Sequence, residues 1–149
     1  MGPRYLLQLL LMLGLVAACS TKSNGPAQPV TPSGPSFALS VEAPPEVKVG
    51  GESAPSIRVV PRGGYKVNME YPTKLQVKAP AGVSPAEETL PKAKAARHTE
   101  GEILFKPAFK LESAGEHAFQ GTLRFSVCTK QQCEIKSETV KWTAKAKAE

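Results

Sequence analysis

The chain contains no aspartate, and all 13 of its acidic residues are glutamates. Aspartate is common in calcium-binding loops and supplies the acid of many hydrolase triads, so its absence disfavours both kinds of site. The only histidines are His98 and His117, and neither lies in a sequence setting typical of a nucleophile or a metal-ligand pair. We therefore expect no hydrolytic centre, no metal and no cofactor.

Aromatic residues are also scarce, at 6% of 149 residues, and the apolar residues crowd into the first eighteen positions. A chain of this length fits one domain, and this composition predicts a modest hydrophobic core. The N-terminal segment accounts for much of the apolar content. Arg4 precedes an apolar run over residues 5–16, which is too short for a membrane-spanning helix of about twenty residues. The run is typical of a secretory signal peptide.

The residues that end this segment are Val16, Ala17, Ala18 and Cys19, and they resemble the lipobox of bacterial lipoproteins. The resemblance implies cleavage after residue 18 and lipidation of Cys19, with palmitate among the acyl chains. Ser20 follows the cysteine, which in that family favours export to the outer membrane. More than one acyl chain gives stable anchoring. The alternative is an ordinary secretory signal in which Cys19 has no special role.

Residues 20–35 are almost entirely Ser, Thr, Pro, Gly and other residues that do not build a core. This composition predicts a flexible linker, which fully extended could span roughly 50 Å. We therefore predict a signal peptide over 1–18, lipidated Cys19 plus linker over 19–36, a folded domain over 37–144 and a tail over 145–149. The formal charge of +6 favours contact with anionic surfaces, and the exported location excludes nucleic acid as a partner.

Apolar residues alternate with polar ones through most of the predicted domain, which indicates half-buried β-strands. Pro107 interrupts one run and predicts an edge strand or a bulge there. The spacing of turn residues between runs predicts an all-β, immunoglobulin-like antiparallel β-sandwich of about seven strands. The predicted strands lie at 37–43, 57–61, 65–71, 75–79, 103–112, 119–127 and 140–144.

The stretch between the fourth and fifth predicted strands, residues 80–100, is rich in Pro, Ala, Lys and Glu. Ser84, Pro85 and Glu87 have the spacing of a helix N-terminus, and Pro91 would stop such a helix within two turns. We therefore expect a long exposed connection that contains one short helix, with His98 in it.

Cys128 and Cys133 are separated by four residues, between the ends of two predicted strands. In an antiparallel hairpin they would face each other, at a Cα–Cα distance of about 4.5 Å in a non-hydrogen-bonded pair. A disulfide accepts that spacing, and the exported location favours its formation. We predict a Cys128–Cys133 disulfide with reachable sulfur. The nearby Lys130 and Arg124 would favour thiol exchange.

The same register places Phe119 opposite Trp142 and Gly121 opposite Val140, which joins apolar residues on one face. Closer to the loop it would place Glu134 and Lys136 on that apolar face. We therefore expect a bulge or a register slip within 134–138.

Several segments resemble the periplasmic N-terminal domain of the thiol:disulfide interchange protein DsbD. They are 64–68, Tyr71-Pro72, 75–77 and 125–133, and the similarity spans about residues 38–143. The resemblance implies an immunoglobulin-like fold and assigns Cys128 and Cys133 to a redox pair. No transmembrane electron channel and no thioredoxin-like domain is found in this sequence.

Two functions remain open from the sequence. In the first, an outer-membrane lipoprotein uses its sandwich as a protein-binding or assembly module of the envelope, such as part of a secretion, adhesion or motility machine, and the Cys128–Cys133 disulfide is a structural staple. In the second, the same cysteines exchange disulfides with a periplasmic partner, which would make the protein a thiol–disulfide interchange enzyme. The sequence does not identify the partner protein.

Overall fold

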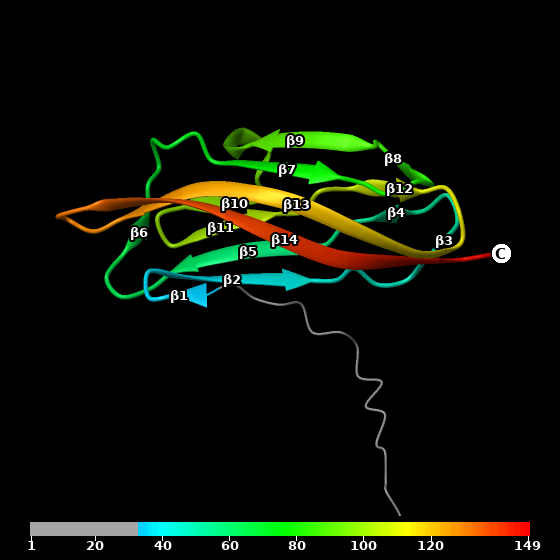
Figure 1. Cartoon of the computed structure of the whole chain (residues 1–149), viewed down its shortest axis with the longest axis horizontal. Helices are drawn as coiled ribbons and strands as arrows, with labels where there is room; N and C mark the ends of the chain where they lie inside the picture. Colours follow the sequence, from blue (N-terminus) through cyan, green and yellow to red (C-terminus); the bar gives the residue numbers. More distant parts are fainter. Residues whose placement is uncertain (1–32) are drawn as a thin grey trace, which may run out of the picture.

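The computed structural model describes residues 33–149. The predicted signal peptide, Cys19 and the linker up to residue 32 lie outside the described residues. The described chain is all-β, with fourteen strands and one short 3-10 helix, η1 (Lys92–Lys94). The strands form an elongated sandwich, with the C-terminus at one end and the turn of the β13–β14 hairpin at the other (Figure 1).

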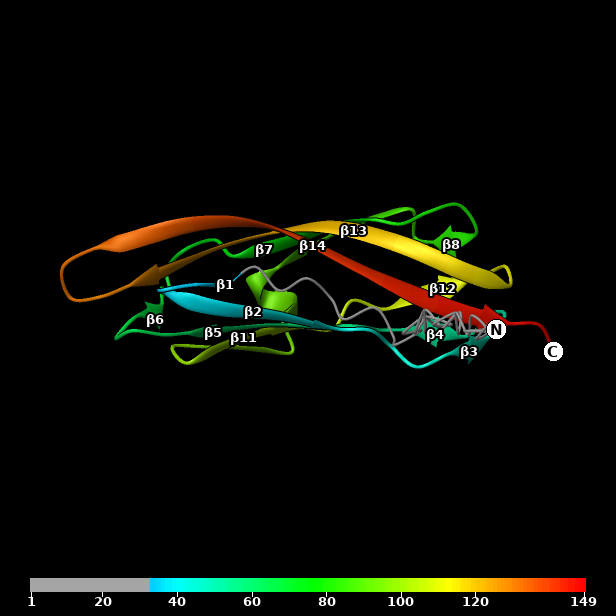
Figure 2. The same cartoon turned by 60° about the horizontal axis from the view of Figure 1, so that its bottom comes forward.

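Two sheets form the layers of the sandwich, and a small third sheet lies towards the C-terminal end (Figure 2). The first sheet has the order β1 (Ser33–Gly34), β2 (Phe37–Glu42), β5 (Ser56–Pro61), β11 (Glu102–Phe105) and β10 (Arg97–Thr99). The second has the order β3 (Val47–Lys48), β14 (Cys133–Lys147), β13 (Gly115–Cys128), β7 (Lys74–Lys78) and β9 (Glu87–Pro91), and β6 (Lys66–Val67) also pairs with β13. The third contains β4 (Glu52–Ser53), β12 (Phe109–Leu111) and β8 (Val83–Ser84).

The strand order is that of an immunoglobulin sandwich. In the first sheet, β2, β5, β11 and β10 take the positions of strands A, B, E and D. In the second, β14, β13 and β7 take the positions of G, F and C, and β9 extends the sheet as C′ does. The pairs are antiparallel except for the parallel pair of β3 with β14. The predicted all-β, immunoglobulin-like fold is confirmed.

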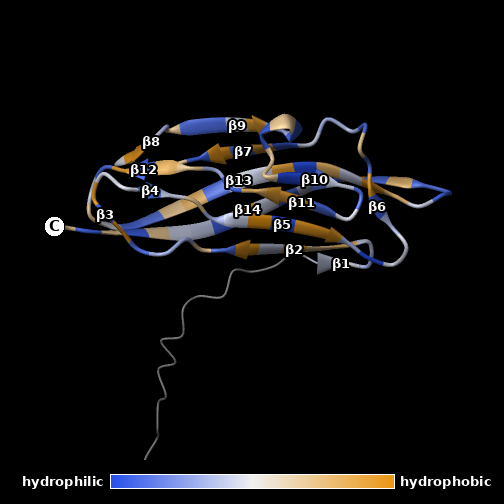
Figure 3. Ribbon diagram, turned by 180° about the vertical axis from the view of Figure 1, so that it is seen from behind, coloured by the Kyte–Doolittle hydropathy of each residue, from blue (hydrophilic) through white to orange (hydrophobic). Residues whose placement is uncertain are grey.

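The core lies between the two sheets and is built from the alternation seen in the sequence. The inward side chains of β2 are fully buried, and those of β5 and β13 continue the same cluster. Three aromatic rings extend it along the hairpin: Phe119 stacks on Trp142 with centroids 4.9 Å apart, and Phe109 lies 5.1 Å from Phe119. The hydropathy colouring shows hydrophobic and hydrophilic residues alternating along the strands (Figure 3).

Several predicted elements are corrected by the structure. Residues 65–71 form only the short β6, because the chain then turns, and Asn68 N–H donates to the carbonyl of Ser126 at the edge of β13. The predicted strand over 103–112 is split at Pro107 into β11 and β12, which belong to different sheets. The prediction of about seven strands is therefore too low for the described residues.

The expected helix at Ser84 is absent from the described fold. The Ser84–Pro85 peptide is cis, and the chain continues as β9, whose Leu90 is buried against the core. The stretch 80–100 therefore contains the strands β8, β9 and β10 rather than a single open connection. The sandwich also passes the predicted boundary at residue 144, because Ala146 is buried and pairs with Val47 of β3.

Candidate functional site: the tip of the β13–β14 hairpin

The hairpin of β13 and β14 runs without interruption from the pair Gly115–Ala146 to the pair Cys128–Cys133. The predicted pairs Phe119–Trp142 and Gly121–Val140 are both present. The expected bulge or slip within 134–138 is wrong, because the register is unbroken. β6 pairs with β13 as far as Cys128, and the turn that joins β13 to β14 projects beyond it at the end of the sandwich (Figure 2).

Cys128 and Cys133 form a disulfide at this tip, as predicted, with an S–S distance of 2.03 Å and a Cα–Cα distance of 4.0 Å. Cys133 is exposed and Cys128 is half-buried. Cys128 lines a shallow cleft of about 370 Å³. The turn after β6, which includes Asn68 and Met69, and Lys130 also border this cleft. A partner can therefore approach the disulfide from solvent at Cys133 and over the cleft at Cys128.

Glu134 lies on the inward side of β14, where the alternation calls for an apolar residue. Its carboxylate accepts hydrogen bonds from the Tyr65 hydroxyl at 2.7 Å and from Ser36 Oγ at 2.8 Å. It also lies 2.7 Å from Lys136 Nζ. These interactions lower the pKa of Glu134 to about 2, with the hydrogen bond from Lys136 as the largest cause. The carboxylate stays ionised at neutral pH and connects β14 to β1–β2 and to the Gly63–Gly64 turn.

Lys136 is likewise accommodated on the inward side. Its ammonium lies 5.7 Å from the centroid of the Phe37 ring, a cation–π contact, and Phe37 meets Phe125 edge-on at 5.1 Å. Near the tip the two sheets no longer cover each other fully, so Glu134 and Lys136 are only half-buried and are paired with each other. Pairing satisfies both charges, and the strand needs no bulge to turn them outward.

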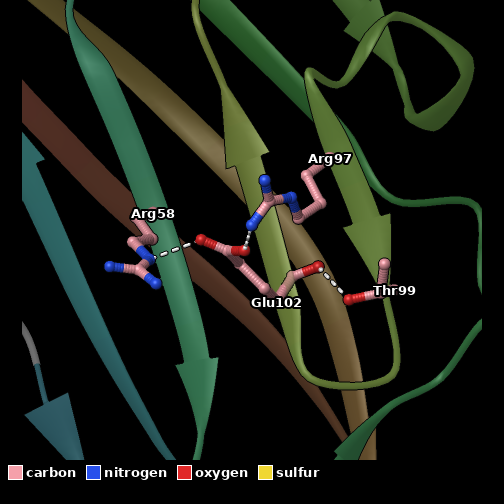
Figure 4. Close-up of polar contacts among 4 residues, drawn as sticks. All are labelled: Arg58, Arg97, Thr99 and Glu102. Atoms are coloured by element: carbon pink, nitrogen blue, oxygen red, sulfur yellow. Dashed lines mark hydrogen bonds and ion pairs between the residues drawn. The ribbon is translucent and has the colours of Figure 1, made fainter.

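A second polar cluster lies on the outer side of the first sheet, where Glu102 is held between two arginines (Figure 4). Its carboxylate contacts Arg58 Nε at 2.5 Å and Arg97 Nη1 at 2.7 Å, while Thr99 Oγ1 donates to the Glu102 carbonyl at 3.4 Å. The Glu102 side chain is 11% exposed, and the hydrogen bond from Arg97 is the largest cause of its lowered pKa. Arg58, Arg97 and Glu102 border a shallow cleft of about 280 Å³.

The sequence analysis did not find this cluster. Arg58 and Arg97 come from strands far apart in the chain, and Glu102 begins a run otherwise apolar, so no local spacing marks them. Cross-strand register alone brings them together, since Leu104 pairs with both Arg58 and Arg97.

Each of the two histidines contacts an oxygen atom of the described structure. His98 lies in β10, with Nε2 3.3 Å from Thr73 Oγ1, and burial lowers its pKa, as does the charge of Lys92 to a smaller extent. His117 is buried in β13, with Nε2 2.8 Å from the Ser113 carbonyl. Within residues 33–149, no cluster of three or more His, Cys or Glu side chains could hold a metal ion. The same residues contain no helix that is long and apolar enough to cross a membrane.

Neither a protein-family model nor a curated protein matches the chain. Among solved structures, it is similar to the CARDB domain of the PF1109 protein from Pyrococcus furiosus, at 15% identity and a TM-score of 0.39, over 78% of this chain and 100% of that one. It is also similar to AggA, the major subunit of aggregative adherence fimbriae type I from Escherichia coli, at 12% identity and a TM-score of 0.36, over 74% and 95%. At these levels of similarity neither structure identifies a function.

Proposed function

We propose that this chain is a lipoprotein of the bacterial outer membrane whose immunoglobulin-like sandwich acts as a protein-binding or assembly module of the cell envelope. The observation that supports it best is the order of segments: a stretch that resembles a lipobox and ends at Cys19, a polar stretch from residue 20, and then the sandwich, which begins at β1. A lipid-anchored domain on a long linker can meet partners well away from the membrane.

The described fold suits binding better than catalysis. Its two clusters of charged side chains consist of paired groups: Glu134 with Lys136, and Glu102 with Arg58 and Arg97. The Cys128–Cys133 bridge closes a short hairpin at a projecting tip, which holds that tip in one shape for a partner to recognise.

Metabolic labelling with palmitate tests the anchoring step. The wild-type chain should incorporate label and fractionate with the outer membrane, whereas Cys19→Ser should incorporate none. A Ser20→Thr variant, which keeps the lipobox cysteine, serves as the matched control and should label normally. Absence of label from the wild-type chain would refute the proposed anchor.

Thiol–disulfide exchange is the second candidate function, and the exposure of Cys133 favours it. In a Cys128→Ser variant, the thiolate of Cys133 would attack a partner disulfide, form a mixed disulfide and release the partner's other sulfur as a thiolate. With Cys128 absent, this mixed disulfide would persist on a non-reducing gel. A Cys133→Ser variant is the control, because it keeps only the half-buried sulfur.

The reduction potential separates the two functions. A bridge with a potential below about −300 mV behaves as a structural staple, whereas exchange catalysts lie well above that value. We propose the staple, and therefore expect a low potential, no trapped partner for Cys128→Ser, and retained partner binding by a Cys128→Ser/Cys133→Ser double variant.

A further inference from the structure

The outer edge of β14 is unpaired over most of its length in the described structure. On one side β14 pairs with β13 along the whole hairpin. On the other it pairs only with β3, at Ala146 and Lys147. Among residues 33–149, no strand pairs with the outer edge of positions 133–145. A long open edge of this kind is a template for another strand.

The disulfide pair identifies which backbone groups of β14 are free. A Cα–Cα distance of 4.0 Å marks Cys128–Cys133 as a non-hydrogen-bonded pair, and the next pair outward, Thr129 and Gln132, carries a hydrogen bond from N–H to carbonyl. The N–H and C=O of Cys133 therefore point away from β13. Because the pattern repeats every second residue, those of Ile135, Ser137 and Thr139 also point outward.

The side chains along this edge discriminate between possible strands. β14 has no proline and no bulge in this region, but it does have charges at Glu134, Lys136 and Glu138. Charges on an edge disfavour pairing with most strands, but opposite charges directly across a strand pair are favourable whereas like charges are destabilising. A second copy of β14 in antiparallel orientation supplies that complement.

We propose that two copies of this protein associate by antiparallel pairing of β14 with β14, with Ser137 of each copy at the two-fold axis. This register places Lys136, which also contacts Glu134 of its own chain, opposite Glu138 of the other copy, and the symmetry makes that juxtaposition twice. It also places Ile135, which is 64% exposed, opposite Thr139, a β-branched residue. The second sheets of the two copies then form one continuous sheet.

Neighbouring registers are less favourable. A two-fold axis at Lys136 places this lysine opposite the same lysine of the other copy and Glu134 opposite Glu138, so like charges meet. A two-fold axis at Glu138 places the Glu138 side chains of the two copies opposite each other. A two-fold axis at Ile135 brings Glu134 of one copy opposite Lys136 of the other. It pairs only residues 133–137, because β14 begins at Cys133. The proposed two-fold axis at Ser137 pairs residues 133–141 of the two copies.

Cysteine crosslinking in cells that express the full chain tests the register. Ser137→Cys places a thiol opposite its own copy, at the roughly 5.5 Å Cα spacing of a hydrogen-bonded pair, which a disulfide accepts. It should give a dimer band on a non-reducing gel. Thr143→Cys lies on the same face of the same strand, away from the two-fold axis, and is the matched control. Equal crosslinking of the two variants, or none for Ser137→Cys, would overturn the proposal.

Proline substitutions test the pairing without an added thiol. Proline at position 139 removes an N–H that points outward, so the intramolecular ladder with β13 keeps its hydrogen bonds. The full chain, purified in detergent, should sediment as a dimer, and Thr139→Pro should weaken that dimer at least tenfold. Thr143→Pro removes an outward N–H outside the paired segment and should leave the dimer intact. Circular dichroism establishes that both variants fold. A monomeric wild-type chain, or a dimer equally weakened by both prolines, contradicts strand pairing.

The Cys19→Ser variant of the full chain separates this association from the anchor. The proposed pairing uses only β14, so the variant should dimerise as the wild type does. Loss of the dimer in Cys19→Ser would assign the association to the N-terminal segment and overturn the β14 interface.

Discussion

The hydroxyl of Tyr65 donates a 2.7 Å hydrogen bond to Glu134, a carboxylate 69 positions away that lies on the inward side of β14. Gln132 in turn donates to the same tyrosine oxygen, also at 2.7 Å. One side chain next to the Gly63–Gly64 turn thus contacts both the loop and the first inward residue of the hairpin tip. Tyr65 and Glu134 together hold the tip against the sandwich.

Protonation of Glu134 should loosen this attachment. Its pKa is lowered from 4.5 to about 2 on folding, so its contribution to stability is complete above pH 4.5 and is lost as the pH falls towards 2. The urea midpoint of the wild type should exceed that of Glu134→Gln at pH 6, and the difference should shrink between pH 4.5 and 2. Lys136→Met removes the largest cause of the shift and should move this loss to higher pH. A difference that stays constant down to pH 2 would contradict this assignment.

Tyr65→Phe should destabilise the hairpin tip more than the remainder of the sandwich. The substitution keeps the ring and removes only the hydroxyl that joins Glu134 to Gln132. We expect faster amide hydrogen exchange at residues 132–136, by about tenfold, with little change in the core strands. Tyr71→Phe is the control, because the Tyr71 hydroxyl makes no hydrogen bond within the described residues. Equal effects of the two substitutions would show that the bond to Glu134 does not hold the tip.

Gly121→Ala should destabilise the sandwich although alanine is the better strand residue. A Cβ at position 121 would lie 2.8 Å from the backbone oxygen of Gln76 in β7 and 3.1 Å from Val140. Backbone cannot move aside cheaply, so we expect a loss of about 1–3 kcal/mol in the free energy of unfolding. Gly101→Ala, where a Cβ meets nothing within 4 Å, should be neutral. Chemical denaturation of both variants checks the prediction, and two equal costs would refute it.

Removal of the arginines around Glu102 should reverse the pH dependence of stability. In the wild type the pKa of Glu102 is lowered, so its contribution is present above its unfolded pKa and declines in acid. In an Arg58→Met/Arg97→Met double variant, burial of the carboxylate remains and raises its pKa instead. The double variant should therefore become more stable relative to wild type as the pH falls from 7 to 4. The triple variant that adds Glu102→Gln should lose this trend. A double variant whose stability relative to wild type does not rise as the pH falls would contradict the prediction.

Replacing the cysteines should cost little and leave the fold unchanged. A bridge that closes so short a loop contributes about 2 kcal/mol by the chain-entropy argument. The double variant Cys128→Ala/Cys133→Ala should lose about that amount in urea unfolding, because the hairpin register is also held by the pairs from Gly115 to Val127. The wild type treated with reductant should show the same loss. Loss of the folded state would show that the bridge is essential to the hairpin.

Much of the fold follows from the alternation of apolar and polar residues. The strands around Phe37, Leu75 and Phe119 were predictable because one side of each is buried between two sheets. Residues 65–71 alternate equally well, but tertiary contacts decide their structure: the Asn68 N–H donates to the Ser126 carbonyl at the edge of β13. No local pattern encodes that contact. The sequence did not predict β9 (Glu87–Pro91), because Ser84, Pro85 and Glu87 have the spacing of a helix start.

The disulfide was predictable because the spacing of Cys128 and Cys133 fits a hairpin loop. The bulge was wrongly predicted because the alternation rule treats inward positions as apolar. Glu134 and Lys136 satisfy each other there, with Tyr65 and Ser36 contributed from distant segments. The Arg58–Glu102–Arg97 cluster depends on the pairing of three strands, and the sequence of no single one of these strands indicates it.

The unbroken pairing of β13 and β14 also determines how the domain would respond to mechanical load. A pull on the carboxyl end at Lys147 runs along β14, so the fourteen cross-strand pairs resist it together in shear. A pull at Ser33 meets only the two residue pairs of β1 with β2 and opens them one after the other. Tension from the amino-terminal side should therefore release β1 first, while the long hairpin stays intact.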